Sequence, residues 1–500
     1  MAMEQYLISV DLGGSKVAAA LGLRSVEGET IVVDAVSKPM QGFTRGEVDN
    51  IEHVTNAIRE AVGELEARNG VKADEVWVGL SGRHIICADN SGFVFVGSPD
   101  GEITEKDVEK LHDNMANVQA PDGKVIISRI PQHYKVDANE TLGSPVGRFG
   151  HRLETTYSFV LGGKVVIERI TKAFKRADIP AVEFVASGVA SASVAATEEE
   201  KESGVIVIDF GAGATDICIY QNKVVRYVAS IPFGSAAINK DIRTTAIPEG
   251  TIETLKTACG YATASAIPES KLNKAVRINA HSPHQKYKEI TYRDLTTIIE
   301  SRMLDIIDFV NAEIKASGYH NRLPAGIVLT GGGSKLAGID TLFRERTGYE
   351  VRLGSAESDI SAESMDGFSA PELATAIGLL NIGMSAKNTP ASDYVKPISK
   401  ASAADVEREE EIATPAIPAA PATPTTPTTP TTPTVPATPQ VPNNTKENTK
   451  EDTKEDTTPE QPAEKKGGKE KEEREPKKRG WWKKVENFFF GGDIVDDEME

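Results

Sequence analysis

The sequence has few cysteines, and its histidines follow no metal-binding pattern. Only three cysteines occur in 500 residues, Cys87, Cys218 and Cys259, and their spacing excludes a disulfide framework and a CxxC metal site. So few thiols fit a reducing cytoplasm, where each is expected to be a small buried residue. The eight histidines form no HxxxH or HExxH motif, so a catalytic zinc site is not expected.

Long apolar runs and an excess of basic residues are also missing. No segment is apolar over the length needed to span a bilayer, and residues 1–6 carry no signal peptide. The 56 Lys and Arg residues are outnumbered by 74 Asp and Glu residues, and the net charge of −18 argues against nucleic acid as a partner. The chain is too long for one domain, and residues up to about 385 can build a large core of two lobes.

Residues 204–220, GVIVIDFGAGATDICIY, have the pattern of a phosphate-binding hairpin. Residues 205–208 form an apolar β-branched run, long enough for a buried strand and too short for a helix. Asp209 ends this run, a turn of small residues follows, and residues 217–220 have the pattern of a second strand. Glycine lets backbone N–H groups approach an anion because no Cβ intervenes. The Asp209 carboxylate could hold a metal ion, directly or through water.

The N-terminus contains a second copy of this pattern. Apolar residues 7–10 lead to Asp11 and a glycine turn, after which residues 17–21 resume a strand. Lys16 lies in the turn, where its ammonium group could reach a phosphate. Either stretch alone could be an ordinary glycine hairpin. Two copies, each with an aspartate at the strand end, predict a duplicated fold with phosphates held between its halves.

A third glycine motif follows an apolar strand at residues 327–329. Thr330 precedes three consecutive glycines and Ser334, and such glycines let the backbone pass close to a flat nucleoside. In their order, the three motifs resemble the two phosphate motifs and the adenosine motif of the actin, Hsp70 and sugar-kinase ATPase superfamily. Residues 183–195 and 372–380 are predicted to be small-residue helices that pack closely near a hinge.

Other elements are predicted from periodicity. Thr104 and Asp107 have the spacing of a capping box at a helix start. The predicted helices are 47–68, 165–176 and 291–316, the predicted strands are 75–80 and 124–130, and a glycine hairpin is expected at 91–97.

Two further runs sharpen the resemblance. IPQHYKVD at 130–137 and SPVGRFGHRLE at 144–154 resemble subdomain 1C of the FtsA family of bacterial actin homologues, which replaces subdomain 1B of actin. The alternative is an ordinary strand–loop insert. The resemblance implies an α/β, actin-like ATPase fold with two lobes and a duplicated RNase H-like core. The expected ranges are 1–86 and 163–203 for subdomain 1A, 87–162 for 1C, 204–240 and 301–387 for 2A, and 241–300 for 2B.

The resemblance also implies a site for ATP and Mg²⁺. Asp11 and Asp209 would position the metal through water. The residues expected to cradle phosphates are Gly13, Gly14, Ser15, Lys16, Gly211, Gly213, Ala214 and Thr215, and those expected to hold the nucleoside are Glu253, Lys256, Gly332, Gly333 and Ser334.

Parts of this site depart from the family or have a second interpretation. Glu253, Lys256 and Gly260 fit an ExxKxxxG helix end that faces the nucleoside in the superfamily, but from spacing alone the first two form a solvated pair. Gly14 lies where relatives often carry threonine, so one hydroxyl contact to a phosphate is expected to be missing. Cys259 lies where relatives often carry an aromatic residue, which changes the expected wall of the pocket.

The C-terminal region has a different composition. Residues 388–476 are predicted to be a disordered linker rich in proline, threonine and charge, in which proline recurs at every third position from Pro415 to Pro442. This is the polyproline II period, so the tract can act as a semi-rigid spacer.

Residues 477–490 are predicted to form a basic, aromatic amphipathic helix that binds membrane, followed by an acidic tail at 491–500. Docking in a protein groove is the alternative, and the FtsA resemblance favours the membrane. The expected membrane-binding residues are Lys477, Lys478, Arg479, Trp481, Trp482, Lys483, Lys484, Val485, Phe488 and Phe489.

Taken together, the resemblance implies an ATP-binding scaffold of bacterial cell division. Such a protein polymerises and tethers filaments of the tubulin-like protein FtsZ to the cytoplasmic face of the inner membrane at the division site. The FtsZ C-terminal tail would bind subdomain 2B, later division proteins would bind 1C, and any ATPase activity would be weak. The alternatives on the same fold are a sugar kinase or other phosphotransferase, a chaperone ATPase and a pilus-assembly relative.

Overall fold

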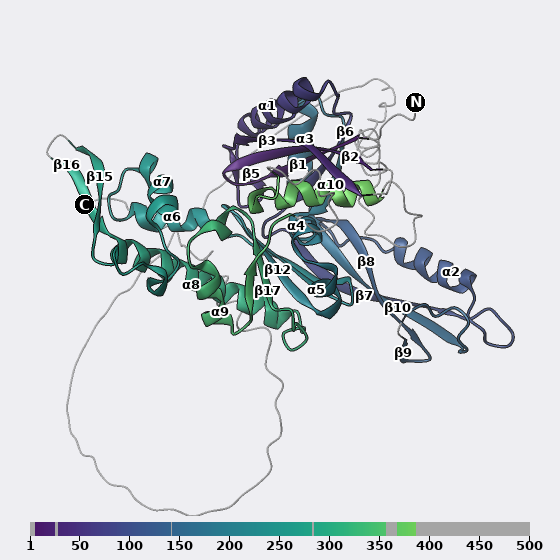
Figure 1. The fold of residues 1–500 in the computed structure, drawn as a ribbon. Helices are drawn as coiled ribbons and strands as arrows, with labels where there is room; N and C mark the ends of the chain where they lie inside the picture. The colour runs from purple at the N-terminus through teal and green to yellow at the C-terminus, as the bar shows by residue number, and fades with distance from the viewer. Residues whose placement is uncertain (1–5, 26–28, 142, 283–284, 357–367, 387–500) are drawn as a thin grey trace, which may run out of the picture. The chain divides into compact units, whose positions relative to one another are not determined.

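The computed structural model describes residues 6–25, 29–141, 143–282, 285–356 and 368–386. A five-stranded sheet forms the core of the first lobe (Figure 1). In its order β11-β6-β1-β2-β3, the strands β1, β2 and β3 are antiparallel neighbours, whereas β6 and β11 are added parallel to β1. The bounds are β1 Tyr6–Leu12, β2 Lys16–Arg24, β3 Thr30–Pro39, β6 Glu75–Leu80 and β11 Ala181–Ala186.

A second sheet, in the second lobe, repeats this plan. Its order is β14-β13-β12-β17-β18, and again three antiparallel strands are followed by two parallel ones. The bounds are β12 Val205–Phe210, β13 Thr215–Gln221, β14 Val224–Ile231, β17 Ile327–Thr330 and β18 Val351–Leu353. The predicted duplication is therefore confirmed.

Two helices of small residues pack between these sheets. Helix α10 (Ala374–Ala386) packs on the first sheet, α4 (Ser187–Ala195) packs on the second, and the two helices pack on each other (Figure 1). Every residue of α4 is buried. The backbones approach so closely that a Cβ on Gly378 would lie 1.8 Å from the carbonyl oxygen of Ala190. The predicted close packing of these helices is confirmed.

Other helices cover the outer faces of the sheets. Helix α1 (Ile51–Asn69) packs on β2 and β3 and on α3 (Lys164–Arg176). In the second lobe, the long helix α8 (Tyr292–Ala316) lies beside α9 (Ile339–Thr347) and α6 (Ser235–Arg243). The same lobe carries α7 (Glu249–Cys259) and a two-stranded sheet of β15 (Ala275–Ser282) and β16 (Gln285–Thr291).

A separate four-stranded sheet lies between β6 and α3 in the sequence. Its order is β7-β10-β8-β9, and α2 (Glu105–Ala116) packs on β7 and β10. The capping box predicted at Thr104 and Asp107 is confirmed. The bounds are β7 Ile86–Phe95, β8 Lys124–Val136, β9 Asn139–Thr141 and β10 Arg152–Gly163.

The structure corrects the start of the first predicted helix. Residues 47 and 48 form the short strand β5 (Glu47–Val48), which pairs with β4 (Phe43–Thr44). Helix α1 begins only at Ile51, because the Asn50 side chain accepts hydrogen bonds from the N–H groups of Glu52 and His53 and caps it. Periodicity alone did not reveal this cap.

Three other predictions were wrong in type or extent. Residues 183–186, the first part of the helix predicted at 183–195, belong to strand β11 (Ala181–Ala186), because this β-branched and apolar segment pairs with β6 in the sheet. Residues 91–95 belong to strand β7 instead of a hairpin turn, because they pair with β10. Helix α10 starts two residues later than predicted, after a 3₁₀ turn at Pro371–Leu373, and runs on to Ala386.

The predicted linker, amphipathic helix and acidic tail at 388–500 lie outside the described residues. Among the helices that are described, none has the length and apolar character needed to cross a membrane.

Candidate functional site

Two glycine turns, one from each sheet, lie against each other. In the first, the Gly13 N–H donates to the Lys16 carbonyl at 2.9 Å, and in the second the Gly211 N–H donates to the Ala214 carbonyl at 3.0 Å. The turns thus have the same internal bond at equivalent positions. A Cβ on Gly14 would lie 3.1 Å from both Cα and N of Gly213. A side chain at position 14 would crowd this contact, and the facing turn would have to move slightly to accommodate it.

A cavity of about 210 Å³ opens beside these turns. It brings together segments that are far apart in the sequence, including the first turn, the third glycine motif (residues 330–334) and the start of α10. Its lining includes Asp11, Gly13, Gly14, Ser15, Lys16, Asp209, Gly211, Glu253, Gly332 and Gly333 from the predicted site, and Ala212, Ser235, Ala236, Asn239, Gly331, Pro371, Glu372 and Thr375, which were not predicted.

Backbone hydrogen bonds fix the second turn to α6. The Ser235 N–H donates to the Gly211 carbonyl at 3.0 Å, and the Ala236 N–H donates to the Ala212 carbonyl at 2.9 Å. The start of α6 thus lines the cavity through Ser235 and Ala236, and its first N–H groups are already paired with the turn.

The third glycine motif is hydrogen-bonded to the segment before α10. Gly331 has φ of +84°, and its N–H donates to the Pro371 carbonyl at 3.2 Å. Glycine is required at this position because a Cβ would lie 2.3 Å from the Asp209 carboxylate. Lys335 and Glu372 form an ion pair across the same contact. The glycine motif is thus held beside the first two motifs.

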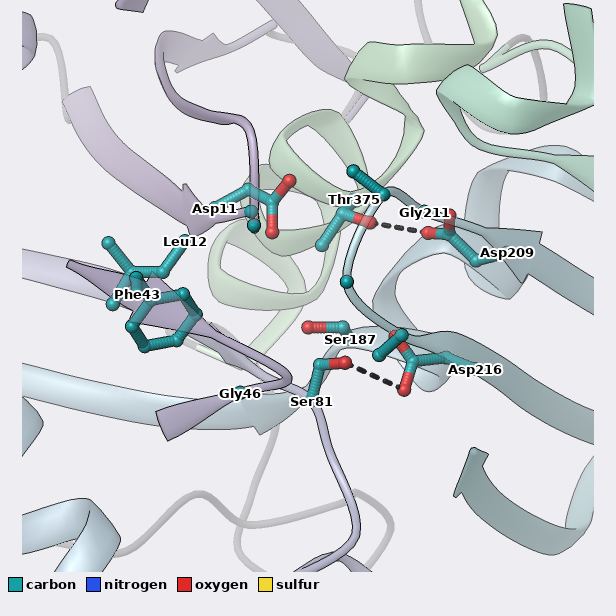
Figure 2. A pocket seen from close by; sticks show the side chains of 15 residues that line it. Asp11, Leu12, Phe43, Gly46, Ser81, Ser187, Asp209, Gly211, Asp216 and Thr375 are labelled. Carbon is teal, nitrogen blue, oxygen red and sulfur yellow. Dashed lines mark hydrogen bonds between the residues drawn. The ribbon is translucent and has the colours of Figure 1, made fainter. Parts of the chain in front are cut away.

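A smaller cavity of about 60 Å³ adjoins the first and contains a third aspartate (Figure 2). Asp216 accepts a hydrogen bond from the Ser81 hydroxyl at 3.0 Å, and Asp209 accepts one from the Thr375 hydroxyl at 2.7 Å. Gly213, Ala214, Ser81 and Ser187 also line this cavity. Asp209 and Asp216 are direct partners across the β12–β13 ladder.

The electrostatics of these carboxyl groups are unfavourable for three negative charges. Burial, with the nearby Asp209, raises the pKa of Asp11 to about 7, although Lys16 opposes the shift. Burial and the same neighbour raise the pKa of Asp216 to about 8. Burial also raises the pKa of Asp209 itself. The carboxyl groups therefore lack enough positive charge around them to remain ionised as easily as in water.

Two groups at the wall of the larger cavity, Lys16 and Glu372, have lowered pKa values. Burial lowers the pKa of the Lys16 ammonium group, and Glu372 and Asp11 only partly offset this. For Glu372, burial favours the neutral acid, but the hydrogen bond from Lys335, a backbone hydrogen bond and the charges of Lys335 and Lys16 together outweigh it and lower the pKa. The cavity thus has a cationic group from the first turn and a carboxylate beside the glycine motif.

Glu253 and Lys256 form an ion pair of 2.8 Å on α7. Lys256 is buried and also donates to the Ser235 carbonyl at 3.3 Å, while Glu253 accepts from the Asn239 amide at 2.6 Å. The hydrogen bonds from Lys256 and Asn239 lower the pKa of Glu253 although burial opposes them. Glu253 lines the larger cavity, whereas Lys256 supports it from behind.

Two other predicted residues, Thr215 and Ser334, line neither cavity, and their hydroxyl groups bond to backbone carbonyls. The Thr215 hydroxyl donates to the Phe233 carbonyl at 2.7 Å, and the Ser334 hydroxyl donates to the Gly331 carbonyl at 2.7 Å. Sequence reasoning missed Ser81, Ser187, Asp216 and Thr375. Asp216 was detectable, because it lies two residues after Ala214 within the hairpin, whereas the others reach the site only through the fold.

Metal ligands in this region are limited to a few carboxylates. Among the described residues, no group of three or more His, Cys, Asp or Glu side chains is close enough to hold a metal ion by itself. Any cation here would need ligands from water or from a bound anion.

Two sequence models of known families match parts of the chain. The sequence model "Cell division protein FtsA" matches residues 206–378, and "SHS2 domain inserted in FTSA" matches residues 82–161. Among solved structures, the PilM-PilN type IV pilus biogenesis complex aligns with a TM-score of 0.52 at 17% identity, covering 76% of this chain and 98% of that chain. At this identity the likeness shows an actin-like fold alone.

Curated relatives share most of the chain. The FtsA of Pseudomonas aeruginosa is 30% identical over 399 residues, which is 80% of this chain and 94% of the relative. The FtsA of Neisseria meningitidis is 30% identical over 76% of this chain and 90% of its own length, and that of Escherichia coli is 27% identical over 81% and 96%. The chain therefore belongs to the FtsA family of cell division proteins.

Proposed function

We propose that this FtsA-family protein binds ATP in the larger cavity and uses it to control assembly into polymers. The observation that carries the proposal is the meeting of three glycine motifs around that cavity. Backbone N–H groups of the two turns and Lys16 are suited to phosphates, while Gly331 to Gly333 leave room for a flat base. A nucleotide that contacts both lobes would favour one lobe angle and so shift the population of assembly-competent molecules.

Magnesium fits the carboxyl groups of this site. Asp11 and Asp209 offer hard oxygen ligands, and the raised pKa values of Asp11 and Asp216 indicate too little positive charge around them. A divalent cation held by Asp11, Asp209, water and phosphate oxygens would supply that charge. When bound, it would neutralise the phosphates. Any ATPase activity is expected to be weak.

The same proposal includes the partners of the family. The protein would polymerise and tether FtsZ filaments to the cytoplasmic face of the inner membrane at the division site. The FtsZ C-terminal tail would bind subdomain 2B, residues 241–300, and later division proteins would bind subdomain 1C, residues 87–162. The chain would thereby help to assemble the septal ring.

Membrane attachment would use residues 477–490. Full burial of one large apolar side chain contributes about 1.5–3 kcal/mol, but partial burial in headgroups and the cost of ordering leave one helix with modest affinity. A polymer presents many helices at once and raises avidity by orders of magnitude. We therefore expect stable attachment to require self-assembly, with the proline-rich linker as the spacer.

Nucleotide binding is tested by titrating purified full-length protein with a fluorescent ATP analogue in Mg²⁺, followed by vesicle sedimentation and electron microscopy on a lipid monolayer with and without FtsZ. We expect ATP to bind and filaments to form on the lipid. Deleting residues 477–490 should abolish sedimentation with vesicles and leave ATP binding unchanged. A chain that neither retains adenine nucleotide nor sediments with vesicles would refute the proposal.

A sugar kinase on the same fold makes a different prediction. Sugar-dependent release of ADP would support that activity, whereas filaments on lipid without it support the scaffold. Tight vesicle binding by an assembly-deficient variant would contradict the requirement for polymers while leaving the ATP site intact.

A further inference from the structure

A short hairpin of the first lobe, β4 and β5, reaches the second phosphate turn. Its two turn residues, Arg45 and Gly46, have φ of +54° and +86°. Glycine is needed at the second position, because a Cβ there would lie 1.9 Å from the Ser81 carbonyl oxygen. Arginine is uncommon in the left-handed region, and such a residue persists where its surroundings hold it in place.

The Arg45 side chain is held by an aromatic ring of the second lobe. Its guanidinium carbon lies 5.3 Å from the centroid of the Phe233 ring, which is a cation–π contact. The Phe233 ring stacks on Phe309 of α8, with centroids 5.8 Å apart and an interplanar angle of 18°. The Phe233 carbonyl in turn accepts the Thr215 hydroxyl. The arginine thus binds a ring that is fixed to the second lobe at two points.

The backbone of the hairpin tip lies on the turn itself. A Cβ on Gly213 would lie 3.3 Å from the Arg45 nitrogen, so the tip lies against the second-lobe turn. A Cβ on Gly82 would lie 2.3 Å from the Arg45 carbonyl oxygen, so the tip is also packed against its own lobe. Phe43 and Gly46 of the same hairpin line the small cavity that contains Asp216 (Figure 2). The tip therefore closes the side of the phosphate region formed by Gly213, and the two lobes cannot separate there without moving it.

We propose that the β4–β5 hairpin tip is an interlobe latch, in which Arg45 on Phe233 acts as a positioning residue that slows release of a bound phosphate ligand. The proposal rests on the nucleotide site proposed above. The Arg45–Phe233 contact joins the two lobes, but neither residue lines the larger cavity. Its loss should therefore speed dissociation of the ligand while leaving the direct contacts to the phosphates unchanged.

Arg45→Asn tests the latch while keeping the turn, since asparagine tolerates the left-handed conformation better than arginine does. In full-length protein, we expect release of N-methylanthraniloyl-ATP to be about two- to fivefold faster, the size of an exposed cation–π contact. The melting temperature should stay the same or rise. Phe233→Leu should give a similar acceleration, and the double variant should not add to it.

Glu47→Gln is the matched control. It lies on the same hairpin and removes an exposed ion pair with Arg83, which does not cross to the second lobe. Its release rate should equal that of the wild type. Equal acceleration by this variant would mean that any damage to the hairpin has the effect, and would overturn the role of Arg45.

Hydrogen exchange without nucleotide gives a second readout. Amides of residues 211–214 should exchange faster in Arg45→Asn and Phe233→Leu than in the wild type and Glu47→Gln. Unchanged exchange together with unchanged release would overturn the latch. If the wild type binds no nucleotide, the proposed function fails, and the exchange comparison still decides whether the hairpin holds the lobes together.

Discussion

The two glycine turns have the same backbone plan and different charges. Asp11 and Asp209 occupy equivalent positions, as do Gly13 and Gly211 by their turn hydrogen bonds. Across the first hairpin, however, Asp11 faces Ala18, whereas Asp209 faces Asp216 across the second. Like charges directly opposite each other in a ladder are destabilising, so the second turn carries a cost that the first does not.

The cations of the two turns differ as well. The first turn contains Lys16, whose charge partly offsets the rise in the pKa of Asp11. The equivalent position in the second turn is Ala214. The comparison teaches that duplication supplies the backbone cradle, whereas a few unmatched side chains give the lobes different charges. The smaller cavity is lined by both lobes and the pKa of an aspartate is raised on each side, but only the second hairpin places two aspartates opposite each other.

The largest expected effect lies where the two duplicated halves meet. Gly378→Ala should lower the free energy of unfolding by about 3 kcal/mol, because the new Cβ would overlap the Ala190 carbonyl and force α4 and α10 apart. Urea denaturation of the purified protein measures this. Gly63→Ala in α1 is the control, because a Cβ there meets nothing within 4 Å and should stabilise by about 0.5–1 kcal/mol. Equal stability of the two variants would contradict the close crossing.

The second prediction concerns the pH dependence of stability that Asp216 causes, because the first hairpin has Ala18 at the equivalent position. The pKa of Asp216 is about 8 in the fold against 3.8 as its ordinary value, so the folded protein holds more protons between these values. Stability should therefore fall as the pH rises from about 4 to about 8. Asp216→Asn cannot lose a proton, so its stability should depend less on pH, and its free energy of unfolding at pH 8 should exceed that of the wild type.

Urea denaturation at several pH values measures that prediction. Asp11→Asn is the matched variant in the first turn. Because the pKa of Asp11 is about 7, this variant should remove pH dependence of stability only up to about that pH. Identical pH profiles for the wild type and Asp216→Asn would show that the second turn does not carry the extra cost.

The smallest effect is expected from a substitution that makes the first turn resemble the second. Lys16→Ala removes the cation that lowers the pKa of Asp11, so that pKa should rise further. The loss of stability between about pH 4 and 8 should then become steeper, by about 0.5–1 kcal/mol at the upper end. Titration of the Asp11 carboxyl by NMR gives a direct check. An unchanged Asp11 titration would mean that the two turns differ by geometry instead of charge.

Local patterns were sufficient for much of the fold and of the cavity. The two hairpins, the third glycine motif and the close-packed helices all follow from apolar runs, small residues and their spacing, because these act within a few residues of one another. Gly13, Gly211 and Gly332 were predicted in this way, and all three line the larger cavity. The start of α1 and the strand at β11 were mistaken because a side-chain cap and a sheet partner decided them.

The sequence by itself determined that two aspartate–glycine turns exist and that small residues flank them. Only the tertiary structure decided that Ser81, Ser187 and Thr375 join these turns, since each comes from a different segment and has no spacing relation to the others. It also decided that Lys256 supports the cavity from behind and that Arg45 reaches Phe233. Contacts between distant segments depend on how sheets and helices pack, and a one-dimensional pattern contains little of that information.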